Sequence, residues 1–285
     1  MRDTRGVEGV SDAATRWEIA TPAGPGRLPG VGMAGFRDRS TDLVDLQVVP
    51  YPAVTVAVDL GDGRGGGLLI EDASGRQRRG SVALGLAPGR VRARGRGIEC
   101  LQIRLSPVVA HAMLGALPDP GGEVVALDDL WGRDAPRVRE RLRAAGSWEE
   151  RFAIAEAALA RRRQERRTVA PEVAHAWRRM VRGRGQVRVE ALAAEVGWSR
   201  KRLWSRFRGQ LGLTPKRAAR LVRFDHAVHR LAAGHTAVRV AAESGYADQS
   251  HLHRDVMAFA GVTPAAAAAA PWLAVDDIAW PTAAP

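Results

Sequence analysis

The sequence predicts an α+β protein of two domains: an N-terminal antiparallel β-rich barrel or sandwich with flanking helices, and a C-terminal all-α domain with two helix-turn-helix units. Three observations predict this fold class. Short β-branched runs alternate with Gly- and Pro-bearing turns in the first part of the chain, helical apolar spacing dominates the second part, and one short pattern occurs twice near the C-terminus. A chain of 285 residues is long enough for two such domains.

Five short apolar or alternating runs predict the strands of the N-terminal domain. They are Leu43–Val49, Ala53–Leu60, Leu68–Glu71, Ser81–Leu86 and Ile98–Leu105. Before them, Thr21–Gly35 contains so many Gly and Pro residues that we expect a loop or an irregular edge there.

After the last strand run the apolar spacing becomes helical. Ser106 is a suitable N-cap and Pro107 suits the first turn of a helix over Val108–Leu117. Further helices are expected at Ala135–Ala144 and Trp148–Arg163, and every segment between residues 171 and 264 predicts helix.

These patterns set the expected domain boundaries. Residues 1–160 form a β-rich sensor or oligomerisation domain, and residues 161–170 form a basic linker. Residues 171–266 form the double helix-turn-helix domain, and residues 267–285 form an Ala- and Pro-rich tail in which no chemistry is visible.

Positive charge is concentrated in the C-terminal half of the chain. The formal net charge is +12, and residues 168–264 alone contain 17 Lys and Arg against 7 Asp and Glu. Such asymmetry predicts a polyanionic partner for that half, of which nucleic acid is the commonest. The base composition of a GC-rich genome would explain why most of the cations are Arg, but it would not explain where they gather.

An internal repeat lies within the basic half. Residues Leu192–Trp198 match Val240–Tyr246 at an offset of 48, and Leu203–Pro215 match Leu252–Pro264 at an offset of 49. The slip of one residue falls between the two blocks, where a tight turn is expected. Repeated blocks of this kind indicate a repeated supersecondary unit.

Each copy has the features of a helix-turn-helix unit. A small residue lets two helices approach, a glycine four residues later permits a positive φ, a polar residue caps the next helix, and apolar anchors at i and i+4 pack its inner face. These positions are Ala193, Gly197, Ser199, Leu203 and Phe207 in the first copy, and Ala241, Gly245, Asp248, Leu252 and Val256 in the second. A plain repeated helical hairpin is the alternative, but it would not explain cationic exposed faces.

The segment of about Gln186–Ala266 resembles the DNA-binding domain of the AraC/XylS family of bacterial transcription regulators. The resemblance is carried by Ala193, Gly197, Leu203, Phe207, Gly212, Pro215, Arg223, Ala227, Leu231, Ala241, Gly245, Tyr246, Gln249, Ser250, Leu252, Arg254, Gly261 and Pro264. It implies that a connecting helix, Pro215–Ala233, holds the two units apart so that both enter successive major grooves. The family usually has Phe where this chain has Leu252 and Val256, so we expect the second unit to pack less tightly or to bind DNA more weakly.

Two sets of DNA contacts follow. The resemblance implies base contacts from Lys201, Trp204, Ser205, Gln249, Ser250 and Arg254. Neighbouring cations and polar groups are expected to hold phosphates: Arg200, Arg202, Arg206, Arg208, Lys216, Arg217 and His253. The alternative for each is a solvated surface residue, and for Trp204 also a partly buried core position.

The sequence predicts no catalytic residue, metal or cofactor. His111 is the only His before residue 170, whereas a metal site in the β domain needs two or three. Cys100 lies in an apolar strand run and is expected to be an inert buried thiol, with redox sensing as the alternative. Gly61–Gly67 has no following helix, which favours a turn over a phosphate-binding loop.

The N-terminal part loosely resembles the β-rich sensor and oligomerisation domains of the same family, mainly over Ile98–Leu117 and Leu127–Trp131. We therefore expect a cytoplasmic transcription regulator that binds double-stranded promoter DNA, with a small-molecule effector, a second copy of the chain and RNA polymerase as candidate partners. No apolar run reaches the ~20 residues of a membrane helix, and Met1–Thr15 has no signal-peptide core. The alternatives are a nonspecific architectural DNA binder and an N-terminal enzyme tethered to DNA.

Overall fold

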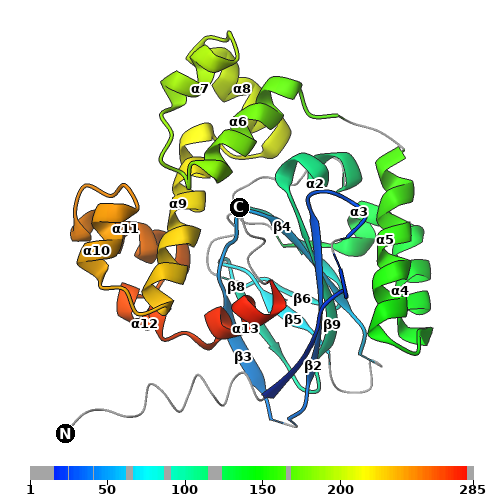
Figure 1. The fold of residues 1–285 in the computed structure, drawn as a ribbon. Helices are drawn as coiled ribbons and strands as arrows, with labels where there is room; N and C mark the ends of the chain where they lie inside the picture. Colours follow the sequence, from blue (N-terminus) through cyan, green and yellow to red (C-terminus); the bar gives the residue numbers. More distant parts are fainter. Residues whose placement is uncertain are drawn as a thin grey trace, which may run out of the picture.

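The computed structural model describes residues 16–24, 26–40, 42–61, 67–86, 91–114, 124–164 and 168–280. The first part of the chain forms antiparallel sheets with helices α2 to α5 beside them, and the rest forms a helical domain. Figure 1 shows the last helix, α13 (red), returning from the helical domain to the strands. The α+β class with a β-rich N-terminal domain and a helical C-terminal domain is confirmed.

The described strands form two antiparallel sheets. The six-stranded sheet has the order β1 (Trp17–Ala20), β2 (Val31–Asp38), β9 (Glu99–Leu105), β4 (Val54–Asp59), β7 (Val82–Leu84) and β10 (Val124–Ala126). The four-stranded sheet has the order β3 (Val44–Val48), β8 (Val91–Gly95), β5 (Leu69–Glu71) and β6 (Gln77–Arg79). All five predicted strand runs contain a strand.

Strand β2 lies where the sequence predicted a loop. It begins at Val31 and pairs with β1 on one side and β9 on the other, so the expected loop over Thr21–Gly35 is wrong from Val31 onward. The glycines that suggested a loop instead leave room for tryptophan rings to pack against the strand. A Cβ at Gly35 would lie 2.3 Å from the Trp148 ring, and one at Gly32 would lie 3.0 Å from the Trp280 ring. A glycine inside a strand often marks such a close approach.

The helices beside the sheets are α2 (Pro107–Leu114), α3 (Leu127–Trp131), α4 (Asp134–Ala144) and α5 (Trp148–Gln164). The start of α2 at Pro107 agrees with the sequence, while residues 115–117 of the expected helix lie outside the described residues. Helix α5 continues to Gln164, inside the segment expected as a linker.

One arginine of the basic run has a structural role. Arg162 donates hydrogen bonds to the backbone oxygens of Met113 (3.3 Å) and Leu130 (3.2 Å) and pairs with Asp134 at 3.2 Å. It therefore fastens the end of α5 to α2, α3 and α4.

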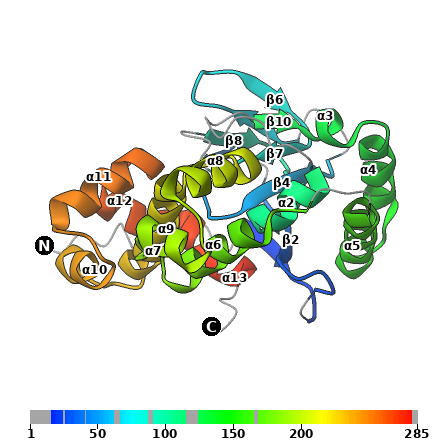
Figure 2. The ribbon, with the colours of Figure 1, turned by 90° about the horizontal axis from the view of Figure 1, so that it is seen from above.

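The helical domain is arranged around its longest helix, α9. The helices are α6 (Pro171–Arg182), α7 (Val189–Glu195), α8 (Arg200–Leu211), α9 (Pro215–Ala232), α10 (Ala237–Glu243), α11 (Gln249–Ala260), α12 (Pro264–Ala268) and α13 (Pro271–Ala279). In Figure 1, α6, α7 and α8 lie toward one end of α9, and α10 and α11 lie toward the other end. Figure 2 shows α10 and α11 on the side of α9 that is away from α2 to α5. Helix α9 contributes nine buried residues, from Pro215 to Leu231, and so provides much of the core shared by both units.

Helix α13 forms in the segment expected as a tail. Leu273 is buried with the main hydrophobic core, whereas Val275, Ala279 and Trp280 pack with the second cluster, inside the β domain. The chain therefore passes through the helical domain and then returns to the β domain. None of the helices among the described residues is both long and apolar enough to cross a membrane.

Candidate DNA-binding surface and ligand cavity

The two repeat copies have the same local geometry at the turn. Gly197 and Gly245 have φ values of +66° and +74°, as the turn after α7 and α10 requires. The side chain of Ser199 then accepts a hydrogen bond from the Arg202 amide (3.2 Å), and Asp248 accepts one from the His251 amide (2.6 Å). Both predicted N-caps are confirmed, and they fix where α8 and α11 begin.

The same device ends each unit. Helices α8 and α11 are followed by Gly212 and Gly261, both in the left-handed region, with φ values of +80° and +70°. Thr214 and Thr263 then cap the following helices, each of which has Pro at its first position. In each copy of the Gly-x-Thr-Pro sequence, the glycine therefore ends one helix and the Thr-Pro pair begins the next, at the same spacing.

Apolar anchors hold the inner face of both helices. Leu203 and Phe207 of α8 and Leu252 and Val256 of α11 are fully buried. At the second unit the rings of Phe224 and Phe259 are also in contact, with centroids 5.0 Å apart and an interplanar angle of 33°. The looser packing or weaker DNA binding expected for the smaller anchors of this unit stays a prediction.

A buried ion-pair cluster fixes α11 against α9. The Asp255 carboxylate accepts hydrogen bonds from Arg220 at 2.7 Å and Arg223 at 3.1 Å, and its side chain is only 2% exposed. Arg223 also lies over the Tyr246 ring, 4.5 Å from its centroid. The orientation of the second helix-turn-helix unit thus depends on a carboxylate that water reaches poorly.

Every residue predicted to contact DNA is exposed on the surface. On α8, Trp204 is 44% exposed, which excludes the core position left open by the sequence. The Arg208 guanidinium lies 5.3 Å from the centroid of the Trp204 ring. Lys201, Ser205 and Arg206 are exposed on the same helix.

The predicted residues of α11 form one group. Gln249, Ser250, His253 and Arg254 line a shallow hollow, and Arg254 Nε donates a hydrogen bond to the Ser250 backbone oxygen at 3.3 Å. At α8, in contrast, Arg200 is paired with Glu190 at 3.0 Å. Arg202 lies over Trp198, 4.6 Å from the ring centroid. The remaining predicted residues, Lys216 and Arg217, are exposed in the first turn of α9.

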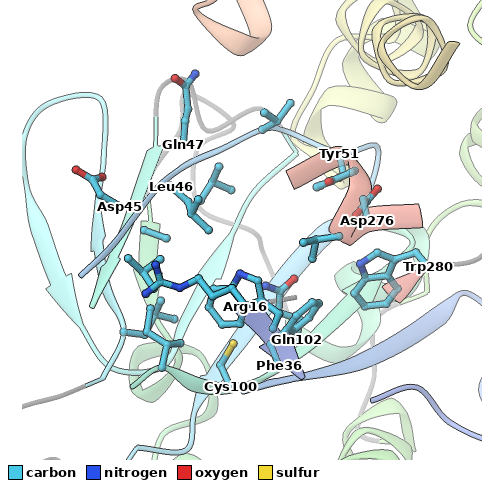
Figure 3. Close-up of a pocket in the computed structure, with 18 of the residues that line it drawn as sticks. Arg16, Phe36, Asp45, Leu46, Gln47, Tyr51, Cys100, Gln102, Asp276 and Trp280 are labelled. Carbon is cyan, nitrogen blue, oxygen red and sulfur yellow. The ribbon is translucent and has the colours of Figure 1, made fainter. Parts of the chain in front are cut away.

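Sequence reasoning missed a second feature, a cavity of about 480 Å³ inside the β domain. Figure 3 shows it between the strands and α13, with Phe36, Leu46 and Cys100 among its lining residues. A cavity of this size and apolar character is typical of small-molecule sites. Within the described ranges, no three His, Cys, Asp or Glu side chains are grouped so that they could hold a metal ion.

The polar end of the cavity contains an arginine between two aromatic rings. The Arg104 guanidinium lies 3.5 Å from the ring centroid of Tyr51 and 4.2 Å from that of Trp280. Its ion-pair partner is Asp276 of α13, which also lies 3.1 Å from Nε2 of His229 in α9. No sequence pattern links these residues, because they lie on four segments that are far apart along the chain.

Two pKa shifts accompany this contact. Burial alone would lower the pKa of His229, but the hydrogen bond with Asp276 and the charge of Asp225 outweigh it and raise that pKa to about 9. Burial would likewise raise the pKa of Asp276, yet His229 and Arg104 hold it below its usual value. At neutral pH, therefore, His229 is cationic and Asp276 is the anion between His229 and Arg104.

Cys100 lies in the cavity wall as a protonated thiol. Burial, helped by the charges of Asp59 and Glu99, raises the pKa of Cys100 to about 12. At pH 8 we therefore expect the native protein to react with iodoacetamide far more slowly than the urea-unfolded chain does. Mass spectrometry measures the extent of alkylation over time. If the native protein were alkylated as fast as the unfolded chain, Cys100 would not be an inert buried thiol.

Comparison with known families identifies the class of protein that these two units define. A family model described as a helix-turn-helix domain matches residues 192–270, which contain both repeat copies. Paired units of this kind, with exposed polar and cationic residues on the second helix of each unit, define a DNA-binding protein. Residues 192–270 belong to the AraC-type helix-turn-helix family, and the chain is a DNA-binding transcription regulator of that type.

Solved structures with a similar chain course include ToxT from Vibrio cholerae. It is 10% identical with a TM-score of 0.48, over 85% of this chain and 98% of that chain. ToxT with a bound unsaturated fatty acid is 11% identical with a TM-score of 0.46, over 85% and 95%. The AraC-like transcriptional activator CuxR is 18% identical with a TM-score of 0.26, over 71% and 83%. None of the curated protein sequences matches the chain.

Proposed function

We propose that this regulator recognises a specific site in double-stranded promoter DNA by placing α8 and α11 in successive major grooves. The observation that carries the proposal is the contrast between the two faces of these helices. The anchors Leu203 and Leu252 are fully buried, while every predicted contact residue is exposed. Helix α9 packs against both recognition helices and would keep their spacing constant.

The exposed residues divide into two roles. Lys201, Trp204, Ser205, Gln249, Ser250 and Arg254 would contact base edges. Arg200, Arg202, Arg206, Arg208, Lys216, Arg217 and His253 would contact phosphates and set the register. Arg200 would exchange its pairing with Glu190 for a phosphate, at a modest cost because both side chains are exposed.

The remaining parts of the proposal concern control. Residues 1–160 sense a small effector in the cavity, residues 161–170 connect them to the DNA-binding domain at 171–266, and residues 267–285 follow it. The protein acts in the cytoplasm without catalysis, and a second copy of the chain and RNA polymerase are its proposed protein partners. A ligand changes DNA binding only if it has different affinities for two states of the protein.

The experiment is a selection from random duplex DNA with the purified full chain at near-physiological salt. We expect an enriched site with two short blocks about 10 bp apart, one helical turn of DNA. An architectural binder would instead show steep salt dependence with no preferred sequence. That result, repeated in the presence of cell-extracted small molecules, would overturn the proposal.

Arg254 provides a sharper test of the proposed docking. We expect Arg254→Ala to weaken binding to the selected site by about 1–3 kcal/mol and to relax preference at one base position. The matched control is Arg182→Ala, which removes an exposed arginine of α6, outside the recognition helices. Titrations on the selected site and on single-base variants should separate the two. An unchanged base preference in Arg254→Ala would show that α11 does not dock as proposed.

A further inference from the structure

The polar end of the cavity offers an unfilled hydrogen-bond donor. Arg104 lies on β9 with its side chain 14% exposed, and it donates one hydrogen bond to Asp276 through a terminal nitrogen. Its Nε is buried and, among the residues that the structure describes, has no hydrogen-bond partner. A guanidinium presents its donors as a fork that suits a bidentate carboxylate. Asp276 therefore occupies only some of the hydrogen-bond donors that Arg104 could present to a carboxylate.

The other charged residues of the cavity wall are already neutralised within the β domain. Arg16 donates two hydrogen bonds of 2.9 Å to Asp38, and Asp45 pairs with Arg92 and Arg94. Arg104 differs because its partner comes from α13, an element that follows the DNA-binding domain in sequence. The rest of the lining is largely apolar, with Phe36, Leu46 and Val48 among its residues.

Asp276 connects the cavity to the DNA-binding domain. Its carboxylate contacts Arg104 on one side and His229 Nε2, at 3.1 Å, on the other. His229 belongs to α9, and its Nδ1 lies 2.8 Å from the backbone oxygen of Asp225 in the same helix. Figure 3 shows Asp276 of α13 next to Tyr51 at this end of the cavity, with Trp280, which follows α13, on the far side of Asp276. Anything that removes Asp276 from Arg104 therefore also disturbs the contact of α13 with α9.

We propose that the Arg104 end of the cavity is a binding subsite for the acidic group of a small, largely apolar monoanion, and that Asp276 of α13 occupies this subsite when no ligand is bound. This inference rests on the proposed effector function of the cavity. The incoming acid takes both the terminal nitrogen and Nε of Arg104. Asp276 leaves, α13 undocks from the β domain, and α9 loses the Asp276 contact with His229.

A second contact places the cavity wall against the DNA-binding helices. Gln47 of β3 lines the cavity, and its side-chain amide donates a hydrogen bond to the backbone oxygen of Ala260, the last residue of α11. A ligand in the cavity can therefore affect the position of α9 through Asp276 and that of α11 through Gln47. Both helices belong to the second helix-turn-helix unit or its support.

The test uses 4-phenylbutyrate as the acidic probe and 4-phenylbutyramide as its uncharged counterpart, with the full chain and calorimetric titration. We expect Asp276→Asn to bind the acid about tenfold more tightly than the unsubstituted protein, since the acid no longer competes with a carboxylate. The matched control is Asp277→Asn, which makes the same change at the next, exposed position of α13 and should bind as the unsubstituted protein does. Arg104→Gln should abolish the preference for the acid over the amide.

A measurement on the unsubstituted protein keeps the test independent of the folding of any variant. With saturating 4-phenylbutyrate, the rate of backbone hydrogen exchange over residues 273–280 should rise. Saturating 4-phenylbutyramide should leave that rate unchanged. Equal binding of acid and amide, or no gain from Asp276→Asn, would overturn the anion subsite while leaving the cavity as an effector site. Failure of both probes to bind any of the proteins would also overturn it. The proposed DNA recognition fails separately, if the selection from random DNA yields no site.

Discussion

Asp255→Ala is expected to lower the free energy of unfolding of the DNA-binding domain by about 3 kcal/mol. The substitution removes a carboxylate that is 2% exposed and that neutralises both Arg220 and Arg223. Arg223 is only 14% exposed and would keep its charge without its carboxylate partner, which is the costly part. Arg220 is 39% exposed and can turn to water, so its share is smaller. Urea denaturation followed by helical circular dichroism measures the loss.

Glu243→Ala is the matched control for this prediction. Glu243 also pairs with two arginines, Arg230 and Arg239, but on the surface of α10. The Glu243 carboxylate is 43% exposed and Arg239 is 60% exposed, although Arg230 is only 18% exposed. Water therefore reaches most of this cluster, and we expect a far smaller change in stability. Similar losses in the two variants would show that burial does not set the strength of the Asp255 cluster. The Asp255 variant should also bind the selected DNA more weakly, because α11 loses its attachment to α9.

The helical domain was predictable because its signals are local. The positive φ of Gly197 and Gly245 and the caps at Ser199 and Asp248 involve partners within a few residues along the chain. Their repetition at offsets of 48 and 49 residues turned weak signals into a strong one. The exposure of the predicted contact residues follows from the same helical periodicity, because the anchors fix which side of each helix is inside.

Strand β2 was not predictable from local composition, because its glycines are required by contacts with residues far away in the sequence. Gly35 admits the ring of Trp148 from α5, and Gly32 admits that of Trp280, which follows α13. A single sequence does not show which aromatic residues will reach a strand across the fold. Glycine therefore suggested a break where it serves a close approach.

The cavity and its closure were missed for the same reason. The tail after Ala265 consists mostly of Ala and Pro with a few ordinary residues, and nothing nearby marks Asp276 as special. Its importance comes from Arg104 and His229, which lie on β9 and α9. Likewise, the arginine run at the end of α5 suggested a free linker, while Arg162 in fact bonds to backbone oxygens of the β domain's helices. The distribution of charge along a sequence predicts the general kind of binding partner. It does not predict which individual charged side chains will form ion pairs in the fold.

Gly185→Ala tests whether the turn after α6 is fixed by the backbone of α9. Gly185 is buried with a φ of +72°, and a Cβ there would lie 2.2 Å from the Ala219 backbone oxygen and 2.6 Å from the Arg223 amide nitrogen. Neither backbone atom can move without displacing α9. We expect a loss of about 3–4 kcal/mol in stability, from left-handed strain and overpacking together.

Gly197→Ala separates the two contributions to that loss. Gly197 has a similar φ of +66°, but a Cβ there would meet no atom within 4 Å, so only the conformational strain of about 1 kcal/mol applies. The difference between the two variants in urea denaturation therefore measures the contact of the turn with α9. Equal losses would mean that α9 shifts freely at Arg223. The same helix turn carries the Arg223 pairing with Asp255, so a shift there should weaken DNA binding in the Gly185 variant more than in the Gly197 variant.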